Sequence, residues 1–379
     1  STGQVRIVTV WPVLNTGKGA DKMKYRFQWT YPIQFSPHDS KTLYAAGNIV
    51  FKSINGGQTW EEISPDLTTN DKSKQVVSGG QITKDTSAAE TYCTIYSFLE
   101  SPYQKGLMWA GSDDGLIHIT EDNAETWNNV TPKDFPEWAR IHCIELSPHS
   151  DSTAYVVATK NMLDDYRPIL YKTTNNGKSW DRIDKSFPQD EITRVLRIDK
   201  NNPNILYVGT ETGLFVSFDD AKTWSKLNSN LPVVPIYDID IKDNNMILAT
   251  HGRSFWILDD ITAISQLNDN IGDNNFILKP ASTYRILPPF GFRLFGTGPD
   301  NGKTYSASLG SPVLIEKSKN PDGEVNVEYL DSGENPPMGV PIYFYLDNEV
   351  DQAELIIKDN KGKILKSFSN ENKNDKSTK

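Results

Sequence analysis

The stretch SINGGQTW, residues 53–60, decides the fold, because it recurs along the chain. Each copy has a Ser or Thr, then an Asp or Asn two positions later, a short turn and a final Ser/Thr-Trp pair. A weaker copy, DNNMILATHGRSFWILDD, spans residues 243–260. A unit of about four strands repeating every 45–65 residues or so predicts the blades of a β-propeller. The clear further copies are TEDNAETW (120–127), TTNNGKSW (173–180) and SFDDAKTW (217–224).

This repeated pattern is the Asp-box. Its Asp or Asn side chain accepts backbone N–H groups inside a tight turn, and a Gly or small residue supplies the positive φ. The Trp packs under the hairpin. We expect these residues to hold hairpins together and not to touch a ligand. They are Asn55, Asp122, Asn175 and Asp219, with Trp60, Trp127, Trp180 and Trp224.

The composition argues against several classes of function. The 379 residues carry a formal net charge of -10, whereas a nucleic-acid surface needs clustered Lys and Arg. No apolar run reaches the roughly 18 residues of a membrane span. Cys93 and Cys143 fit no zinc spacing, and both buried thiols and a disulfide remain open. Asp- and Asn-rich loops offer oxygen ligands to Ca²⁺, but no calcium-loop spacing supports a site, so no metal or cofactor is predicted.

The most variable segments are expected on the face opposite the Asp-boxes. In a four-stranded meander, that face is built from the turns between the second and third strands and from the loops between blades. The loop at residues 65–90 exceeds the length of about 12–15 residues beyond which loops are usually functional or disordered. The turns contribute Asp113, Asp114, Asp164, Asp165, Arg167, Glu211, His251 and Arg253.

Two kinds of candidate site residue follow. The carboxylates Asp113, Asp114, Asp164, Asp165 and Glu211 are candidates for the acid and base of glycoside hydrolysis, although adjacent carboxylates rarely converge on one bond and often bind their own turn. Arg140 and Arg194 are predicted at equivalent positions, at the start of two innermost strands and pointing toward a central channel. Trp109, Trp138 and Tyr166 are candidate sugar-stacking platforms, with core packing the more expected role of Trp109. The predicted ligand-binding set is His251, Arg253, Arg140, Arg194, Arg167, Trp138 and Tyr166.

Longer phrases resemble a known family. They include KYRFQWTYPIQFSPHD (24–39), WAGSDDGLIHIT (109–120) and THGRSFWILDD (250–260). They are similar to bacterial BNR/Asp-box repeat proteins, described as glycosyl hydrolase or sortilin N-terminal-like, which resemble xyloglucanases in architecture. The resemblance runs from about residue 3 to about residue 367. It implies propeller blades, but it transfers no catalytic residue, because the catalytic carboxylates of xyloglucanase-like enzymes lie one in each of two propellers.

The chain divides into four predicted parts. Residues 1–262 hold about five blades, expected to be the C-terminal part of a larger propeller assembly whose upstream blades come from the same or another chain. Residues 263–335 are predicted to be a linker and extended segment, apart from a strand pair near residues 276–287 that returns toward the propeller. Residues 336–369 are predicted to start an immunoglobulin-like β-sandwich. Residues 370–379 are predicted to be a disordered tail.

Two functions are consistent with these features. The first is a secreted propeller, extracellular, periplasmic or on the bacterial cell surface, that binds a glycan or a peptide on the face opposite the Asp-boxes without catalysis. The alternative is a glycoside hydrolase with an acid/base carboxylate pair in a cleft shared with missing blades. A hydrolase requires two carboxylates roughly 5–10 Å apart beside an open groove, whereas a binding protein does not.

Overall fold

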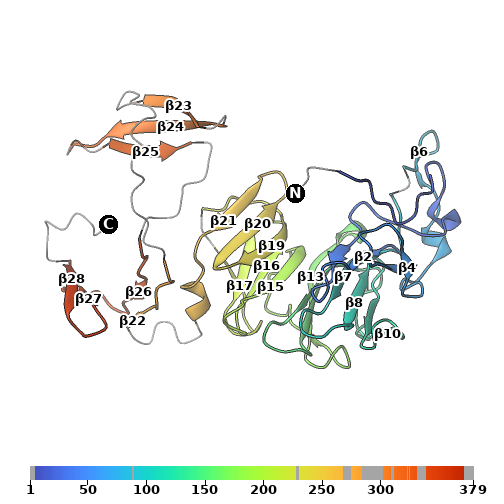
Figure 1. The fold of residues 1–379 in the computed structure, drawn as a ribbon, viewed down its shortest axis with the longest axis horizontal. Coiled ribbons are helices and arrows are strands. Elements are labelled where there is room, and N and C mark those ends of the chain that lie inside the picture. Colours follow the sequence, from blue (N-terminus) through green and yellow to red (C-terminus); the bar gives the residue numbers. More distant parts are fainter. Residues whose placement is uncertain are drawn as a thin grey trace. The chain divides into compact units, whose positions relative to one another are not determined.

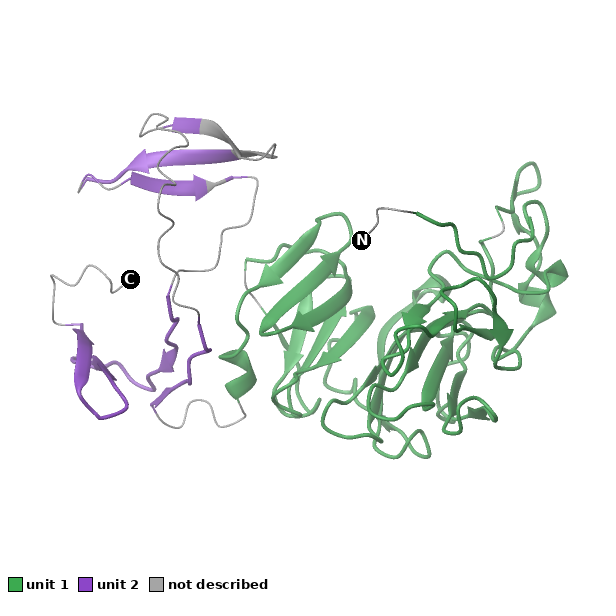
Figure 2. Cartoon of the chain, viewed as in Figure 1, with its two compact units in different colours: residues 1–271 green, residues 272–379 purple. Residues whose placement is uncertain are grey.

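The computed structural model describes residues 5–87, 89–227, 230–267, 275–283, 302–308, 311–321, 323, 325–330 and 339–370. The chain forms two compact units, residues 1–271 and 272–379 (Figure 2). The predicted all-β class is confirmed: the described helical segments are short 3-10 turns, none of them long and apolar enough to cross a membrane. They are η1 (Ala20–Lys22), η2 (Lys72–Lys74), η3 (Asn161–Leu163) and η4 (Ile264–Gln266).

In the first unit, the loop at residues 65–90 contains a two-stranded hairpin of β5 (Ser78–Gly79) and β6 (Lys84–Asp85). The other five antiparallel sheets of this unit follow one another along the chain, each built from consecutive strands (Figure 1). They are the blades that the repeats predict, and the fifth has three described strands instead of four. The first sheet contains β1 (Ile33–Phe35), β2 (Leu43–Ala46), β3 (Val50–Ser53) and β4 (Glu61–Glu62); the second β7 (Ile95–Glu100), β8 (Met108–Ser112), β9 (Ile117–Thr120) and β10 (Asn128–Asn129). The third contains β11 (Arg140–Leu146), β12 (Ala154–Lys160), β13 (Asp165–Thr173) and β14 (Asp181–Arg182); the fourth β15 (Thr193–Ile198), β16 (Leu206–Thr210), β17 (Leu214–Ser217) and β18 (Ser225–Lys226); the fifth β19 (Ile236–Lys242), β20 (Asn245–Thr250) and β21 (Phe255–Leu258).

The first strands of successive sheets contact one another and form a common inner edge. β7 contacts β11, β11 contacts β15, and β15 contacts β19. Buried apolar side chains fill the space between neighbouring sheets, among them Trp109 and Tyr171 between the second and third sheets. In the part of the chain that the structure describes, no comparable contact joins the fifth sheet to the first. The five sheets therefore form an open arc.

The Asp-box turns are closed by side-chain hydrogen bonds. Asp122 Oδ1 accepts from the backbone N–H of Thr126 at 2.9 Å and from the hydroxyl of Thr120 at 2.7 Å. Bonding to the Thr126 hydroxyl is the largest cause that lowers the pKa of Asp122 to about 2. The residue two positions after each Asp or Asn has a positive φ, as the tight turn requires. Asn55, Asn175 and Asp219 accept from the equivalent backbone N–H in their own turns.

Three of the four Asp-box tryptophans also join their sheet to the preceding one. Each indole N–H donates to the backbone carbonyl of the residue that follows the short fourth strand of the previous sheet. Such a bond contributes about 1 kcal/mol to stability, and it fixes the spacing of neighbouring blades. The pairs are Trp127 with Ile63 at 3.0 Å, Trp180 with Val130 at 2.7 Å and Trp224 with Ile183 at 3.3 Å.

The first Asp-box differs in this respect. Trp60 Nε1 is buried and has no hydrogen-bond partner among the described residues. The N-terminal segment lies on this turn, where Arg6 donates to the carbonyl of Gly56. Trp11 packs edge-on against Tyr25, with ring centroids 4.9 Å apart. The N-terminal segment therefore covers part of the surface that a preceding sheet would cover, but it supplies no carbonyl acceptor for the N–H of Trp60.

The second unit differs from the prediction of an extended segment over residues 263–335. The strands β23 (Gly302–Ser308), β24 (Ser311–Lys319) and β25 (Val325–Tyr329) form a three-stranded antiparallel sheet there. The sequence did not reveal these strands because polar and small residues occupy much of them. The described strand near residue 276 also departs from the prediction, because β22 (Phe276–Ile277) pairs with β26 (Phe344–Tyr345) inside the second unit.

The end of the described chain has the predicted hairpin. β27 (Glu354–Lys358) pairs with β28 (Ile364–Ser369), and Asp359 accepts two backbone N–H groups in the turn between them. An immunoglobulin-like sandwich stays a prediction. Of the predicted disordered tail, residues 371–379 lie outside the described residues.

Replacing Trp180 by Phe keeps an aromatic ring but removes the N–H that binds Val130. Trp60→Phe is the matched control, because its N–H has no described acceptor. We expect Trp180→Phe to lower the free energy of unfolding by about 1 kcal/mol more than Trp60→Phe does, as measured by urea denaturation. Equal losses in the two variants would show that the indole bonds do not stabilise the packing of the blades.

Candidate functional site

A β-bulge interrupts the innermost strand in each of four consecutive sheets. A bulge inserts one extra residue and re-aims its side chain. The four bulged residues therefore occupy the same position in successive blades, along the common inner edge. We call them the inner row: Tyr96 of β7, His142 of β11, Arg194 of β15 and Tyr237 of β19.

The side chains of the inner row touch one another in order. The rings of Tyr96 and His142 have centroids 5.1 Å apart. Arg194 Nη1 lies 3.2 Å from His142 Nε2, and the Arg194 guanidinium lies 5.0 Å from the centre of the Tyr237 ring. The ring of the candidate His251 lies 5.0 Å from that of Tyr237. The row thus runs without interruption from the second blade to the fifth.

Arg140 and Arg194 are not equivalent, contrary to the sequence-based expectation. The bulges align Arg194 with His142, two residues after Arg140. Arg194 lines a cavity of about 400 Å³ beside the inner row and donates its Nε to the candidate Glu211 at 2.7 Å. Arg140 lines a different cavity. The expectation was wrong because the spacing of two residues in a sequence does not reveal a bulge.

The second cavity, about 240 Å³ in volume, lies among the loops of the second and third blades. We call it the loop cavity. Segments from the side opposite the Asp-boxes surround it, including the loop at residues 65–90 and the turns that follow β8 and β12. Its lining consists of Lys74, Tyr92, Asp113, Trp138, Arg140, Thr159, Lys160, Asn161, Met162 and Leu163.

Trp138 stands at a strained position in the wall of the loop cavity. It is the third residue of a turn closed by the Ala139 N–H, which donates to the Pro136 carbonyl at 3.2 Å, and its φ is 64°. Glycine is the residue that this position usually requires. The indole stacks on Tyr92 with ring centroids 5.8 Å apart, and Lys74 Nζ lies 5.4 Å from its centre. An aromatic wall is therefore held in place at a cost in backbone energy.

Arg140 lies beside this aromatic wall. Its guanidinium is 4.9 Å from the centre of the Tyr96 ring, so it connects the loop cavity to the inner row. Its Nη2 donates to Met162 Sδ at 3.3 Å. Its Nε is buried without a hydrogen-bond partner among the described residues. The cation is thus positioned by the fold while part of its hydrogen-bonding capacity remains unused.

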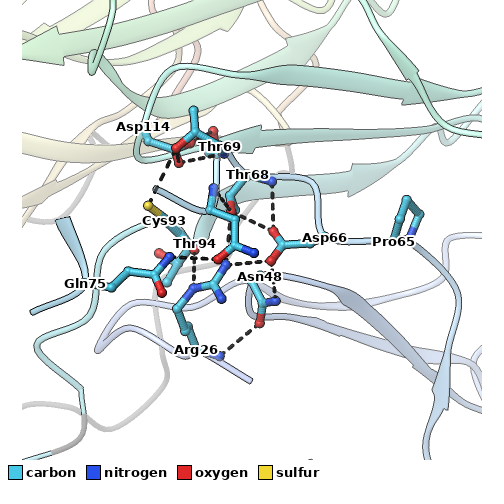
Figure 3. A network of polar contacts seen from close by, with 12 residues as sticks. Arg26, Asn48, Pro65, Asp66, Thr68, Thr69, Gln75, Cys93, Thr94 and Asp114 are labelled. Carbon is cyan, nitrogen blue, oxygen red and sulfur yellow. Dashed lines mark hydrogen bonds and ion pairs between the residues drawn. The ribbon is translucent and has the colours of Figure 1, made fainter. Parts of the chain in front are cut away.

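A polar network fixes the long loop that carries Lys74 (Figure 3). The buried Arg26 forms an ion pair with Asp66 at 2.7 Å and donates to the hydroxyl of Thr68 at 3.1 Å. Further along, the N–H and hydroxyl of Thr69 both donate to the candidate Asp114, at 2.9 and 2.7 Å. These bonds attach the loop to the segment before β1 and to the turn after β8, so Asp114 has a structural role in the wall of the site.

Asp113 is the neighbour of Asp114 in the turn after β8, and it binds the segment just before β7. Its carboxylate accepts from the N–H of Thr94 at 2.8 Å and from the Thr94 hydroxyl at 2.7 Å. Burial raises the pKa of Asp113 to about 7, and the hydrogen bonds from Thr94 act in the opposite direction. In the described part of the chain it is the one carboxylate that lines the loop cavity.

The candidates at the end of the turn after β12 and at the start of β13 are bound to one another. Asp165 accepts from Arg167 Nε at 2.8 Å and Nη2 at 2.6 Å, and this hydrogen bonding is the largest cause that lowers the pKa of Asp165 to about 2. Asp164 has a φ of 59° and accepts from the half-exposed Tyr166 hydroxyl at 3.4 Å. None of the four lines the loop cavity.

Arg253 belongs to the turn after β20. Its carbonyl accepts from the indole N–H of Trp256 at 3.0 Å, and the turn is closed by Thr250 and Ser254. The structure therefore brings His251 to the inner row, whereas the described contact of Arg253 is made by its backbone.

Neither cysteine forms a disulfide. Cys93 and Cys143 are both free and buried. Cys143 lies in β11, whereas Cys93 precedes β7 and has a φ of 63°. No group of His, Cys, Asp or Glu side chains suited to a metal ion occurs among the described residues.

Similarity to known proteins is partial. No family model matches the chain. The xyloglucanase Xgh74A of Acetivibrio thermocellus is 30% identical over 150 residues, 36% of this chain and 18% of that protein. The xyloglucanase of Hypocrea jecorina is 25% identical over 177 residues, 43% of this chain and 21% of that protein. The vacuolar protein sorting/targeting protein 10 of Schizosaccharomyces pombe is 28% identical over 131 residues, 30% of this chain and 8% of that protein.

The chain therefore spans about a fifth or less of the length of these relatives. Among solved structures, the GH74 xyloglucanase from Xanthomonas campestris has a TM-score of 0.46 and 14% identity, and it covers 60% of this chain and 36% of its own.

Several residues of the site were not singled out from the sequence. Tyr92, Tyr96, His142 and Tyr237 are ordinary-looking residues in or beside strands, and it is the bulges and the arc that bring them together. Lys74 lies in a long loop whose path depends on the network around Arg26. The unusual length of that loop was the feature of the sequence that could have indicated its part in the site.

Asp113→Asn tests the burial of this carboxyl group. The folded pKa of about 7 lies above the ordinary value of 3.8, so the folded chain binds the proton more tightly and loses stability as the pH rises from about 4 to 7. Asn stays neutral, so we expect the free energy of unfolding of the variant, relative to the unsubstituted protein, to rise across this range. Urea denaturation at several pH values measures it, with Asp164→Asn as the exposed control. A difference independent of pH would contradict the assignment.

Proposed function

We propose that this chain is the ligand-binding part of a carbohydrate-binding β-propeller. The loop cavity and the inner row form its binding surface. The observation that carries the proposal is Trp138, an aromatic side chain held at a positive φ in the wall of a cavity.

The backbone of Trp138 is the main argument. A non-glycine residue in the left-handed region costs about 1–2 kcal/mol. Glycine at this position would remove that strain, and the chain uses glycine at other turns of positive φ, such as Gly115. An indole at this site therefore suggests a use for its ring. Aromatic rings pack against the C–H faces of sugars, and the stacked pair with Tyr92 offers such a surface.

The surroundings of Trp138 also suit a sugar. The lining of the loop cavity includes hydroxyl, amide and charged groups beside its aromatic rings, which is the composition expected for polar ligands with apolar faces. The relatives with a stated substrate are xyloglucanases, named for a polysaccharide. A peptide ligand, which the sequence left open, is an alternative outcome of the test below.

Glycoside hydrolysis is a second candidate function. Asp113 lines the loop cavity and its pKa is raised to about 7, as a general acid requires. However, Thr94 binds this carboxylate twice, and no second carboxylate among the described residues lines the cavity to act as its partner. Binding without catalysis is therefore the better-supported function of this chain.

Two further expectations belong to the proposal. A polysaccharide ligand implies a location outside the cytoplasm, extracellular, periplasmic or at the cell surface. Further blades of the same or another chain are the proposed partners of the open arc, and the unpartnered indole N–H of Trp60 supports this.

Trp138→Gly tests the function without straining the fold. Glycine accepts a φ of 64°, so we expect the melting temperature to change little while affinity for the bound polysaccharide falls at least about tenfold. Titration calorimetry against a panel of plant and bacterial polysaccharides measures the affinity. Tyr103→Ala, which removes a half-exposed aromatic ring outside the cavity, is the control. The proposal is wrong if no polysaccharide binds, or if Trp138→Gly and Tyr103→Ala have the same effect.

A further inference from the structure

We infer that the loop cavity recognises an acidic sugar, a uronate residue whose carboxylate is bound by Arg140 with Lys74 and Lys160 beside it. This inference rests on the proposed function and adds the class of the ligand. It follows from the positive charges that line the cavity and from the lack of a carboxylate partner for Arg140 among the described residues.

Arg140 differs from the other arginines of the blades, apart from the exposed Arg253. No carboxylate among the described residues lies within ion-pair distance of its guanidinium, and its Nε is buried without a partner. Its acceptor is the sulfur of Met162, which is a weak one. A guanidinium binds a planar carboxylate in a fork of two hydrogen bonds. The arginines that already have a carboxylate partner are Arg26, Arg167, Arg182, Arg194 and Arg197.

Two lysines add positive charge to the same cavity. Lys74 ends the turn η2 and lies over the ring of Trp138. Lys160 ends β12, where it pairs in register with Asp165. Asp165 accepts two hydrogen bonds from Arg167, and no ion pair between Lys160 and a carboxylate occurs among the described residues.

The surroundings do not neutralise these three cations. The one carboxylate in the described lining is Asp113, whose oxygens accept from Thr94 and whose charge is disfavoured by burial. The chain as a whole has a net charge of -10. A local excess of positive charge in an acidic protein favours an anionic ligand at that place.

The size and walls of the cavity favour a sugar over a larger anion. Its volume of about 240 Å³ is below the 300 Å³ or so at which pockets enclose whole drug-sized ligands. It fits one residue of a longer chain. The ring of Trp138 stands in the same lining as Arg140, so one sugar ring can present its C–H face to the indole and its carboxylate to the guanidinium. A phosphate or sulfate group alone would bind the cations but would not use the aromatic rings of the lining.

The test compares acidic oligosaccharides with their own methyl esters, which differ in charge and keep the same sugar rings. Oligomers of galacturonate, mannuronate and guluronate, and glucuronic-acid-substituted xylan, are titrated into the purified chain by calorimetry. We expect at least one acid to bind about tenfold more tightly than its ester, and about 0.5 M salt to reduce that difference. Arg140→Gln should lower the affinity for the acid to that for the ester and leave the ester unchanged. Lys178→Gln, an exposed charge on an Asp-box turn, is the control.

The outcomes separate this inference from the proposed function. Equal affinities for every acid and its ester, or an equal loss for both in Arg140→Gln, would overturn the acidic ligand while leaving a neutral-sugar site in place. Failure of all acids, esters and neutral polysaccharides to bind would overturn the carbohydrate function itself. Tighter binding of an acidic hexapeptide than of any uronate, lost in Arg140→Gln, would also overturn the sugar assignment.

Discussion

The structure depends on a hydrogen bond that crosses from one sheet to the next. The first three sheets each present a carbonyl just after the short fourth strand, and the tryptophan of the following Asp-box donates to it. The Asp or Asn of the same turn holds the hairpin that carries the tryptophan. Because one repeated motif both closes a turn and fixes the neighbouring blade, the inner strands come into line, and their bulged residues meet. The inner row is a consequence of this repeated spacing.

The Asp-box turns fix one face of each blade, so the loops on the opposite face can vary. Loops there differ in length and composition, yet they are not loose where they meet the site. Arg26 and Asp66 anchor the longest of them, and Asp114 attaches it to the second blade (Figure 3). Residues that resemble catalytic carboxylates in the sequence are therefore partly the supports of a binding surface. These carboxylates are numerous on this face because the long loops there must be held against the repeated blades.

The sequence predicted the blades well because the Asp-box carries its own local chemistry, so strand order followed from counting copies. It predicted the site less well. Trp138 and Arg140 could be named because Trp138 lies just before, and Arg140 begins, a strand whose place in the blade was known. The alignment of Arg194 with His142 depends on a bulge, and the place of Lys74 depends on contacts distant in sequence, so neither was visible. The strands β23 to β25 were missed because the polar and small residues around them masked the short apolar pattern of β24 and β25.

The cavity beside Arg194 and the loop cavity differ in how their charges are balanced. The larger one contains Arg194 and Arg197, but Glu211 and Asp238 already bind these cations. A ligand anion there would have to displace a carboxylate of the chain itself. The loop cavity carries strain at Trp138 and an unsatisfied donor at Arg140, and no partner in the described part of the chain relieves either. Proteins keep such local violations mainly where function requires them. The smaller cavity is therefore the better candidate for the ligand, although the larger one has more room.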